Sequence, residues 1–191
     1  MTSRLAPKSF EELTPEQQAQ YERMAKTRKP RADGQFGGPF DPLIRSPEVA
    51  RRTISLGNYI WERTSVGRRI VELAIIVTGR HWRSNVEWVA HAKMARDEGV
   101  SDAVIQSVFD QVEPPESAPE DEKLTIAVCR ALHETGDLPL PLYQKAVEQW
   151  GEAGLIDIIQ TIGFYTFVSM ILNTFNIPTA EGDPTPFPRD E

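Results

Sequence analysis

Three residues in the first half of the chain carry side chains that can transfer protons. Glu72 interrupts an otherwise apolar run over residues 70–77, where a carboxylate is costly to bury without a partner. Glu87 and His91 lie four residues apart in a helical stretch, so they share one face of the expected helix. Two carboxylates and an imidazole that converge would form an acid/base site, because the pKa of histidine lies near neutrality.

Each of these residues also has a purely structural interpretation. The Glu87–His91 spacing is typical of a pair that stabilises its own helix. Glu72 could form a structural ion pair with an arginine, and the nearest partners on an adjoining helix are His91 and Arg83. From the residues alone, the structural and the catalytic interpretations both stay open. A single histidine makes a poor transition-metal site, so we expect no metal and no cofactor.

The composition limits the class of protein. A chain of 191 residues is long enough for one domain with a sizeable core. The net charge of −7 argues against nucleic acid and against an anionic membrane surface as partners. The apolar stretch over residues 155–172 approaches the length of a membrane span, but Asp157 and other polar residues interrupt it. We therefore expect a helix buried in the core or in a subunit interface.

The cysteine content and the first residues bear on location. Cys129 is the one cysteine of the chain, which excludes an internal disulfide framework and a Cys-x-x-Cys motif. A lone cysteine in an apolar helix is more typical of a small core residue than of a nucleophile. Residues 1–10 show no apolar signal region. We expect a cytoplasmic protein, since that compartment keeps thiols reduced.

The elements that must hold the three residues are predicted to be helices throughout. No alternation of apolar and polar residues indicates a strand, so the predicted fold class is all-α. A loop rich in glycine and proline is expected over residues 29–45, and an extended tail, disordered or wrapped around a neighbour, after residue 178. Capping residues, glycines and prolines place about eight helices near residues 15–28, 47–63, 66–81, 85–98, 102–112, 120–135, 139–150 and 155–172.

The residues around His91 resemble the carboxymuconolactone decarboxylase and alkyl hydroperoxidase D superfamily. In the peroxidase branch, a glutamate precedes a Cys-x-x-Cys-x-x-x-His motif. Here Ser84 and Glu87 stand at the two cysteine positions, while Glu72 and His91 match the glutamate and the histidine. The segment Glu-Trp-Val-Ala-His at 87–91 resembles the cysteine-free, decarboxylase-like branch, as do residues 38–47 and 163–173. The loop departs from the family pattern, which carries an amide near Asp41 and often a histidine near Arg45.

The resemblance implies a single-domain alkyl hydroperoxidase D-like bundle. It covers roughly residues 34–178, preceded by a helical arm at 1–33 and followed by a proline-rich tail at 179–191. It also implies a homo-oligomer, a trimer or a hexamer, with pockets near the subunit contacts.

The expected chemistry follows from the missing thiols. Disulfide-based peroxide reduction needs a reactive thiolate and a resolving thiol, which Ser84 and Glu87 cannot supply. By resemblance, we expect a carbon–carbon lyase of aromatic compound degradation that uses no cofactor and acts on a small carboxylate or lactone. Decarboxylation, isomerisation and lactone hydrolysis all stay open. His91 is the expected general acid or base, Glu87 orients it or moves a second proton, and Glu72 holds the imidazole tautomer or acts as the other half of a proton relay.

Other residues are expected to bind the substrate. An arginine could hold a carboxylate through two hydrogen bonds. The candidates are Arg45, Arg80 and Arg83, with Ser84, Phe40 and Trp88 as further pocket residues. The alternative is a non-catalytic helical oligomer that binds a small apolar acid or a partner protein. The two hypotheses differ in one observable, because catalysis requires the three proton-transfer residues within hydrogen-bond reach beside a cavity.

Overall fold

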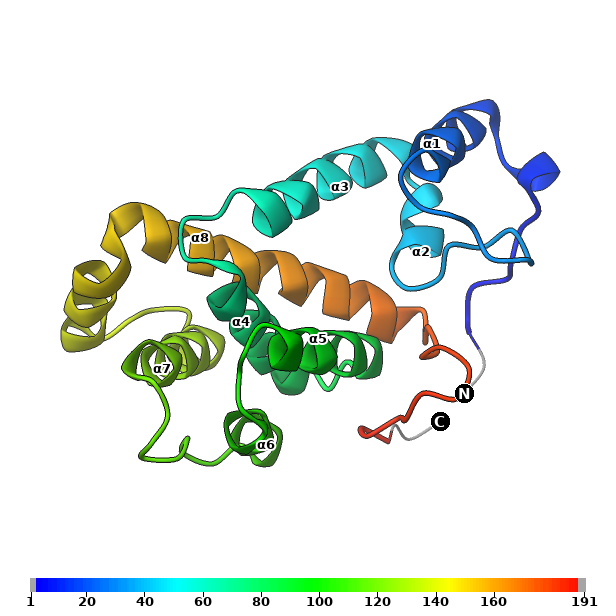
Figure 1. The fold of residues 1–191 in the computed structure, drawn as a ribbon. Coiled ribbons are helices and arrows are strands. Elements are labelled where there is room, and N and C mark those ends of the chain that lie inside the picture. Colours follow the sequence, from blue (N-terminus) through cyan, green and yellow to red (C-terminus); the bar gives the residue numbers. More distant parts are fainter. Residues whose placement is uncertain (1–2, 189–191) are drawn as a thin grey trace.

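Helices form all the regular secondary structure of residues 3–188, the part of the chain that the computed structural model describes (Figure 1). The predicted all-α fold class is therefore confirmed. The helices are α1 (Pro15–Ala25), α2 (Phe40–Ile44), α3 (Pro47–Glu62), α4 (Arg68–His81), α5 (Asn85–Asp97), α6 (Asp102–Asp110), α7 (Glu120–Thr135) and α8 (Leu140–Thr174), with a 3-10 turn at Phe10–Glu12.

Local sequence signals set several of the helix ends. At the start of α1, the Thr14 hydroxyl accepts a hydrogen bond from the Gln17 amide at 3.3 Å, and the Gln17 side-chain oxygen accepts one from the Thr14 amide at 3.1 Å. This reciprocal cap satisfies two amides that lack a partner within the helix. At the end of α7, Gly136 adopts a φ of 74°, which favours glycine.

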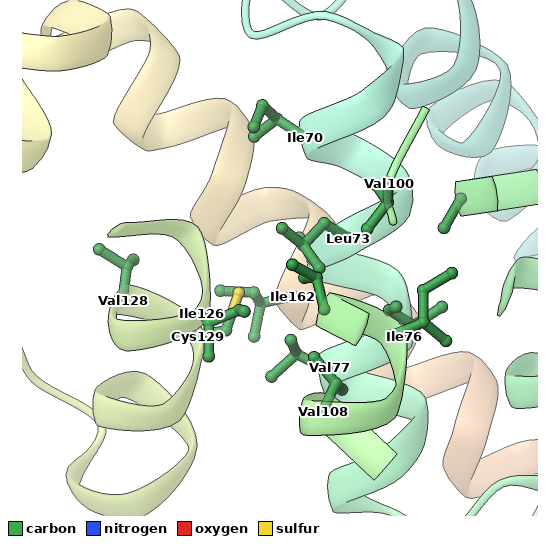
Figure 2. Packing of buried hydrophobic residues seen from close by; sticks show 14 of the residues in the cluster. Ile70, Leu73, Ile76, Val77, Val100, Val108, Ile126, Val128, Cys129 and Ile162 are labelled. Carbon is green, nitrogen blue, oxygen red and sulfur yellow. The ribbon is translucent and has the colours of Figure 1, made fainter. Parts of the chain in front are cut away.

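Helix α4 is the centre of the fold. Every residue from Ile70 to Gly79 is buried, because α5, α7 and α8 all pack against this helix. Figure 2 shows Leu73, Ile76 and Val77 of α4 meeting apolar side chains from its neighbours. A helix that is apolar nearly all round is expected in such a central position. Glu72 is the one charged residue within that buried segment, and its side chain is fully buried.

Helix α8 combines the two last helices predicted from the sequence. Gly151 interrupts it with non-helical backbone angles (φ 67°, ψ 174°), so the chain bends at the glycine where the sequence predicts a break. By length and composition alone α8 could cross a membrane, but the core helix of a folded domain meets the same criteria. The buried Asp157 carboxylate accepts hydrogen bonds from the Tyr59 hydroxyl and from the Ser65 amide and hydroxyl. These bonds tie α8 to α3 and to the turn that leads into α4.

The segment predicted as loop contains a short helix. Asp41 accepts hydrogen bonds from the amides of Phe36 and Gly37, both at 2.8 Å, and this turn starts α2. A small apolar cluster of Leu13, Met24 and Ile44 then joins the N-terminal arm to α2. Figure 1 shows α1 and α2 together at the N-terminal end of α3.

The tail folds back on its own chain. The Phe187 side chain is buried against Trp88 and Phe109, and the Asn85 side chain forms two hydrogen bonds with the Phe187 backbone, at 2.9 and 2.8 Å. As described to residue 188, the tail therefore packs against α5 and α6 of its own chain. The predicted domain boundaries at 33 and 178 stay predictions.

Candidate active site

The three residues singled out in the sequence converge in the structure. His91 Nδ1 lies 2.7 Å from Glu72 Oε2, and His91 Nε2 lies 3.3 Å from Glu87 Oε2. All three side chains are buried. The short contact places a proton on His91 Nδ1, because a carboxylate oxygen bound to a protonated nitrogen can only accept. The imidazole is thus held between two carboxylates, one from α4 and one from its own helix, α5.

The second contact is an ion-pair distance without hydrogen-bond alignment. Glu87 Oε2 is buried and has no hydrogen-bond partner among residues 3–188. A buried polar atom without a partner is uncommon in folded proteins and needs an explanation. Here the atom lies 3.3 Å from His91 Nε2, and both residues line a cavity.

A fourth charged residue, Arg68, contacts Glu72. Arg68 forms an ion pair with Glu72 from four residues earlier on α4, and its guanidinium lies 3.1 Å from the centre of the Trp61 ring. The Trp61 indole donates to the Tyr165 hydroxyl at 3.3 Å, and the Tyr165 ring meets the His91 ring edge to face. Glu72 therefore has both of the partners that its burial requires, an arginine and the histidine.

The turn between α4 and α5 positions Glu87. The Ser84 amide donates to the Gly79 carbonyl at 2.8 Å, and Arg83 occupies the turn with a φ of 49°. A methyl group added at Gly79 would lie 3.3 Å from Glu87 Cβ and 3.4 Å from the Trp88 amide nitrogen. Glycine at position 79 thus lets the two helices approach closely enough to bring Glu87 beside His91.

Burial and charge shift the pKa values of the site toward the protonated forms. Burial raises the pKa of Glu87, with His91 opposing this and Glu72 adding to it. Burial acts to lower the pKa of His91, but the hydrogen bond to Glu72 and the charges of Glu87 and Glu72 outweigh it, so the His91 pKa is raised. Burial and the Glu87 charge also raise the pKa of Tyr165. The raised pKa values favour a neutral Glu87 carboxyl group and a protonated His91.

The cavity beside these residues is suited to a small molecule. Its volume is about 490 Å³, which lies within the usual range for ligand pockets. The lining is mostly apolar, and its polar residues are Arg28, Thr53, Asn58, Glu62, Glu87 and His91. The apolar lining comes from Phe40, Leu43, Ile54, Trp61, Val86, Met94, Phe164, Tyr165 and Val168 on α2, α3, α5 and α8.

Two of the predicted pocket residues lie elsewhere. Phe40 lines the cavity as expected. Trp88 packs in the core against Phe109 and Phe187, on another side of α5. Ser84 is fully buried at the cap position of α5, and its hydroxyl has no hydrogen-bond partner among the described residues.

The expected placement of three arginines beside the pocket is wrong within one chain. The Arg45 guanidinium donates to the Ala6 carbonyl at 2.6 Å, on the side of the N-terminal arm. Arg80 donates to the Phe109 carbonyl at 2.6 Å, and Arg83 donates to the Pro188 carbonyl. None of the three lines the cavity. The sequence could not reveal this, because each side chain follows a tertiary contact: Arg45 with the N-terminal arm, Arg80 with α6 and Arg83 with the tail.

The single thiol is far from this chemistry. Cys129 is fully buried in the apolar core on α7, where Figure 2 shows it beside Ile126 and Ile162. Burial raises the pKa of this thiol to about 12, which leaves very little thiolate at neutral pH. Cys129 has the character of a core residue, as predicted.

The other two histidines form a separate pair. His81 and His133 stack with ring centres 4.3 Å apart, and His133 Nε2 lies 3.1 Å from the Thr78 hydroxyl. Burial, and then the charge of His81, lower the pKa of His133 to about 4. Neither residue lies in the Glu72–His91–Glu87 site.

Solved structures share this fold at low sequence identity. No protein-family model matches the chain, and no curated protein matches it in sequence. The alkylhydroperoxidase AhpD core of an uncharacterised peroxidase-related protein from Ralstonia eutropha JMP134 is 13% identical, with a TM-score of 0.73 over 94% of this chain and 93% of that one. A protein of unknown function from Agrobacterium tumefaciens, a candidate AhpD antioxidant defence protein, is 16% identical, with a TM-score of 0.65 over 74% and 97%.

A third solved structure is that of an enzyme. A cysteine-to-alanine variant of the debrominase Bmp8, in complex with 2,3,4-tribromopyrrole, is 13% identical, with a TM-score of 0.70 over 97% of this chain and 95% of that one. The chain therefore has the alkyl hydroperoxidase D-like fold, and the predicted fold is confirmed. Identities of this size establish the fold, and the chemistry must be argued from the site.

Proposed function

We propose that the cavity is the active site of an enzyme that performs acid/base chemistry on a small, mostly apolar substrate, without a thiol. One observation carries the proposal. Glu72, His91 and Glu87 form a buried chain of contacts, and two of its members, His91 and Glu87, also line the cavity.

The geometry supports distinct roles for the three residues. With its Nδ1 proton held by Glu72, a neutral His91 offers the lone pair of Nε2 to the cavity. In an isomerisation, Nε2 takes a proton from a carbon next to a carbonyl group, and the C–H electron pair moves onto the carbonyl oxygen. Protonated Glu87 returns a proton to a second carbon and takes up the proton from His91 afterwards. No oxidant or reductant is consumed.

The same residues support a decarboxylation. The C–C electron pair stays on the substrate carbon as CO₂ leaves, and an adjacent unsaturated group delocalises it. Protonated Glu87 or the His91 imidazolium then delivers a proton to that carbon. We propose decarboxylation or a related lyase, isomerase or lactone reaction, as in the decarboxylase-like branch that residues 87–91 resemble.

The fold relatives support a pocket for a small ring. The debrominase Bmp8 variant was crystallised with 2,3,4-tribromopyrrole, a small aromatic ring. In this chain Phe40, Trp61 and Phe164 provide flat apolar surfaces to the cavity, and such surfaces suit a ring of that size. The non-catalytic alternative required a solid core with the acidic side chains paired to arginines. Glu72 has such a pairing with Arg68, but Glu87 does not.

We also propose that the chain forms a homo-oligomer, a trimer or a hexamer. On α8, Ile156, Ile159 and Met170 are 62%, 44% and 44% exposed, and a partner would remove this apolar surface from water. Light scattering of the purified protein tests this, and a monomer would contradict it. The cytoplasmic location stays a prediction from the sequence.

A screen of small ketones, keto acids and lactones in deuterated water tests the catalytic proposal. It measures deuterium incorporation into carbon and CO₂ release together. We expect His91→Ala and Glu87→Gln to lower the rate on the responding substrate by roughly a hundredfold or more, the usual range for losing a general acid or base. His81→Ala is the matched control, because it removes a histidine outside the site. Equal rates in the wild type, His91→Ala and Glu87→Gln would contradict the proposal.

A further inference from the structure

A further charged residue, Arg28, lines the cavity and comes from the N-terminal arm. Arg28 follows α1 and lines the cavity together with Phe40. Its guanidinium lies over the Phe40 ring, 4.2 Å from the ring centre. The sequence offers no sign of this arrangement, because Arg28 is 63 residues away from His91 and lies outside the stretch that resembles the family.

Arg28 lacks the partner that a half-buried cation normally has. Within residues 3–188 its side chain forms neither an ion pair nor a hydrogen bond. Burial lowers its pKa, and no acidic side chain acts against that effect. Arg45, Arg80 and Arg83, in contrast, all donate to backbone carbonyls. An arginine held against an aromatic ring with its donors unused is ready to bind an anion.

The charges of the site favour an anion at this position. Glu72 forms ion pairs with Arg68 and His91, and Glu87 lies at ion-pair distance from His91, so each of the two carboxyl groups already has a basic partner. Glu62 also borders the cavity, but it is exposed and lies outside ion-pair distance of Arg28. The positive charge of Arg28 is therefore not matched within the cavity.

We propose that Arg28 is the specificity-determining residue of the pocket, and that it binds the carboxylate of a substrate whose apolar body extends toward His91. This rests on the proposed active site. It assigns to the N-terminal arm a role in substrate selection: α1 and the segment after it bring the anion-binding group, while α4 and α5 bring the proton-transfer groups. A Phe40 ring under the guanidinium fixes its plane, which suits the two parallel hydrogen bonds of a carboxylate.

Binding measurements test the proposal without relying on turnover. The probes are small carboxylates, each paired with its uncharged amide, for example benzoate with benzamide and cyclohexanecarboxylate with its carboxamide. Ligand-observed NMR gives the ratio of the two affinities. We expect the wild type to prefer the carboxylates by about tenfold or more, since hydrogen bonds to charged groups are the stronger ones. Arg28→Met should reduce the preference to about twofold or less, while methionine keeps an apolar contact with Phe40.

Three further variants make the result specific. Arg23→Met removes an exposed arginine of the same arm and should keep the wild-type preference. Arg28→Lys keeps the charge but loses the planar fork, so it should give an intermediate preference, and it also replaces Arg28→Met if that variant fails to fold. His81→Gln changes a histidine outside the site and should keep the preference, and because the readout is binding and not turnover, the result separates this proposal from the catalytic one. Wild-type protein that binds no carboxylate better than its amide, or an unchanged preference in Arg28→Met, would overturn the assignment.

Discussion

The hydrogen bond between Glu72 and His91 makes a quantitative prediction about the imidazole. In Glu72→Gln the side chain keeps its shape but loses its charge, so the effects that raise the His91 pKa are weakened while its burial is unchanged. A hydrogen bond to a charged group contributes about 1.5–3 kcal/mol, and one pKa unit corresponds to about 1.4 kcal/mol. We therefore expect the His91 pKa to fall in the variant, because the imidazolium loses about 1.5–3 kcal/mol of stabilisation.

The same shift has a consequence for stability. Because the folded pKa of His91 is raised above its unfolded value, its contribution to the free energy of unfolding is fully present below about pH 6.5. That contribution is lost as the pH rises through the folded pKa. Glu72→Gln removes it, so the difference in unfolding free energy between wild type and variant should shrink as the pH rises. Chemical denaturation at several pH values measures this trend.

NMR titration of the imidazole protons measures the pKa directly, since the chain has three histidines that single substitutions can assign. Glu62→Gln is the matched control, because Glu62 borders the same cavity but does not contact His91. It should leave the His91 pKa unchanged, since an exposed charge is largely screened. A His91 pKa that stays the same or rises in Glu72→Gln would refute this account of the site.

Three further changes follow from the packing and the charges. Phe187→Ala should lower the free energy of unfolding by about 3 kcal/mol, the lower end for loss of a buried phenylalanine, as measured by denaturant titration; a loss below about 1 kcal/mol would mean that the tail is not packed on α5. Since the folded pKa of His133 is lowered to about 4, stability should fall as the pH drops from about 6.5 toward 4. His133→Asn should remove roughly 1–2 kcal/mol of that loss, a figure reduced for solvent screening. Thermal melts over this pH range measure it, and a variant whose stability depends on pH as steeply as that of the wild type would contradict the reasoning. Gly79→Ala should displace Glu87 by a few tenths of an ångström, which should lower turnover with a small change in stability. Full activity together with a wild-type melting temperature would contradict the close approach of α4 and α5.

The candidate site was largely predictable because its residues are close in sequence. The cost of burying Glu72 in an apolar run and the four-residue spacing of Glu87 and His91 are local signals, and the structure brings all three together. Arg68 could have been found in the same way, since it stands four residues before Glu72 on the same helix. The all-α fold class was predictable as well, because helical periodicity is also a local signal in the sequence.

Features that depend on distant contacts could not be predicted. The short helix α2 was missed because its glycines and prolines indicate a loop, while the turn of Asp41 that starts it is a tertiary detail. Arg28 reaches the cavity through the packing of α1, and Phe187 reaches the core through the path of the tail. Arg80 was expected at the pocket because it lies near His91 in sequence, but helical geometry directs it toward α6.

The central claim is that this site transfers protons without sulfur. The most direct test compares the deuterium incorporation rate of the responding substrate in wild type, Cys129→Ala and His91→Ala. We predict that Cys129→Ala keeps the wild-type rate, because its thiol is buried in the core, and that His91→Ala loses roughly a hundredfold or more. A rate that vanishes with Cys129 and survives the loss of His91 would contradict the account.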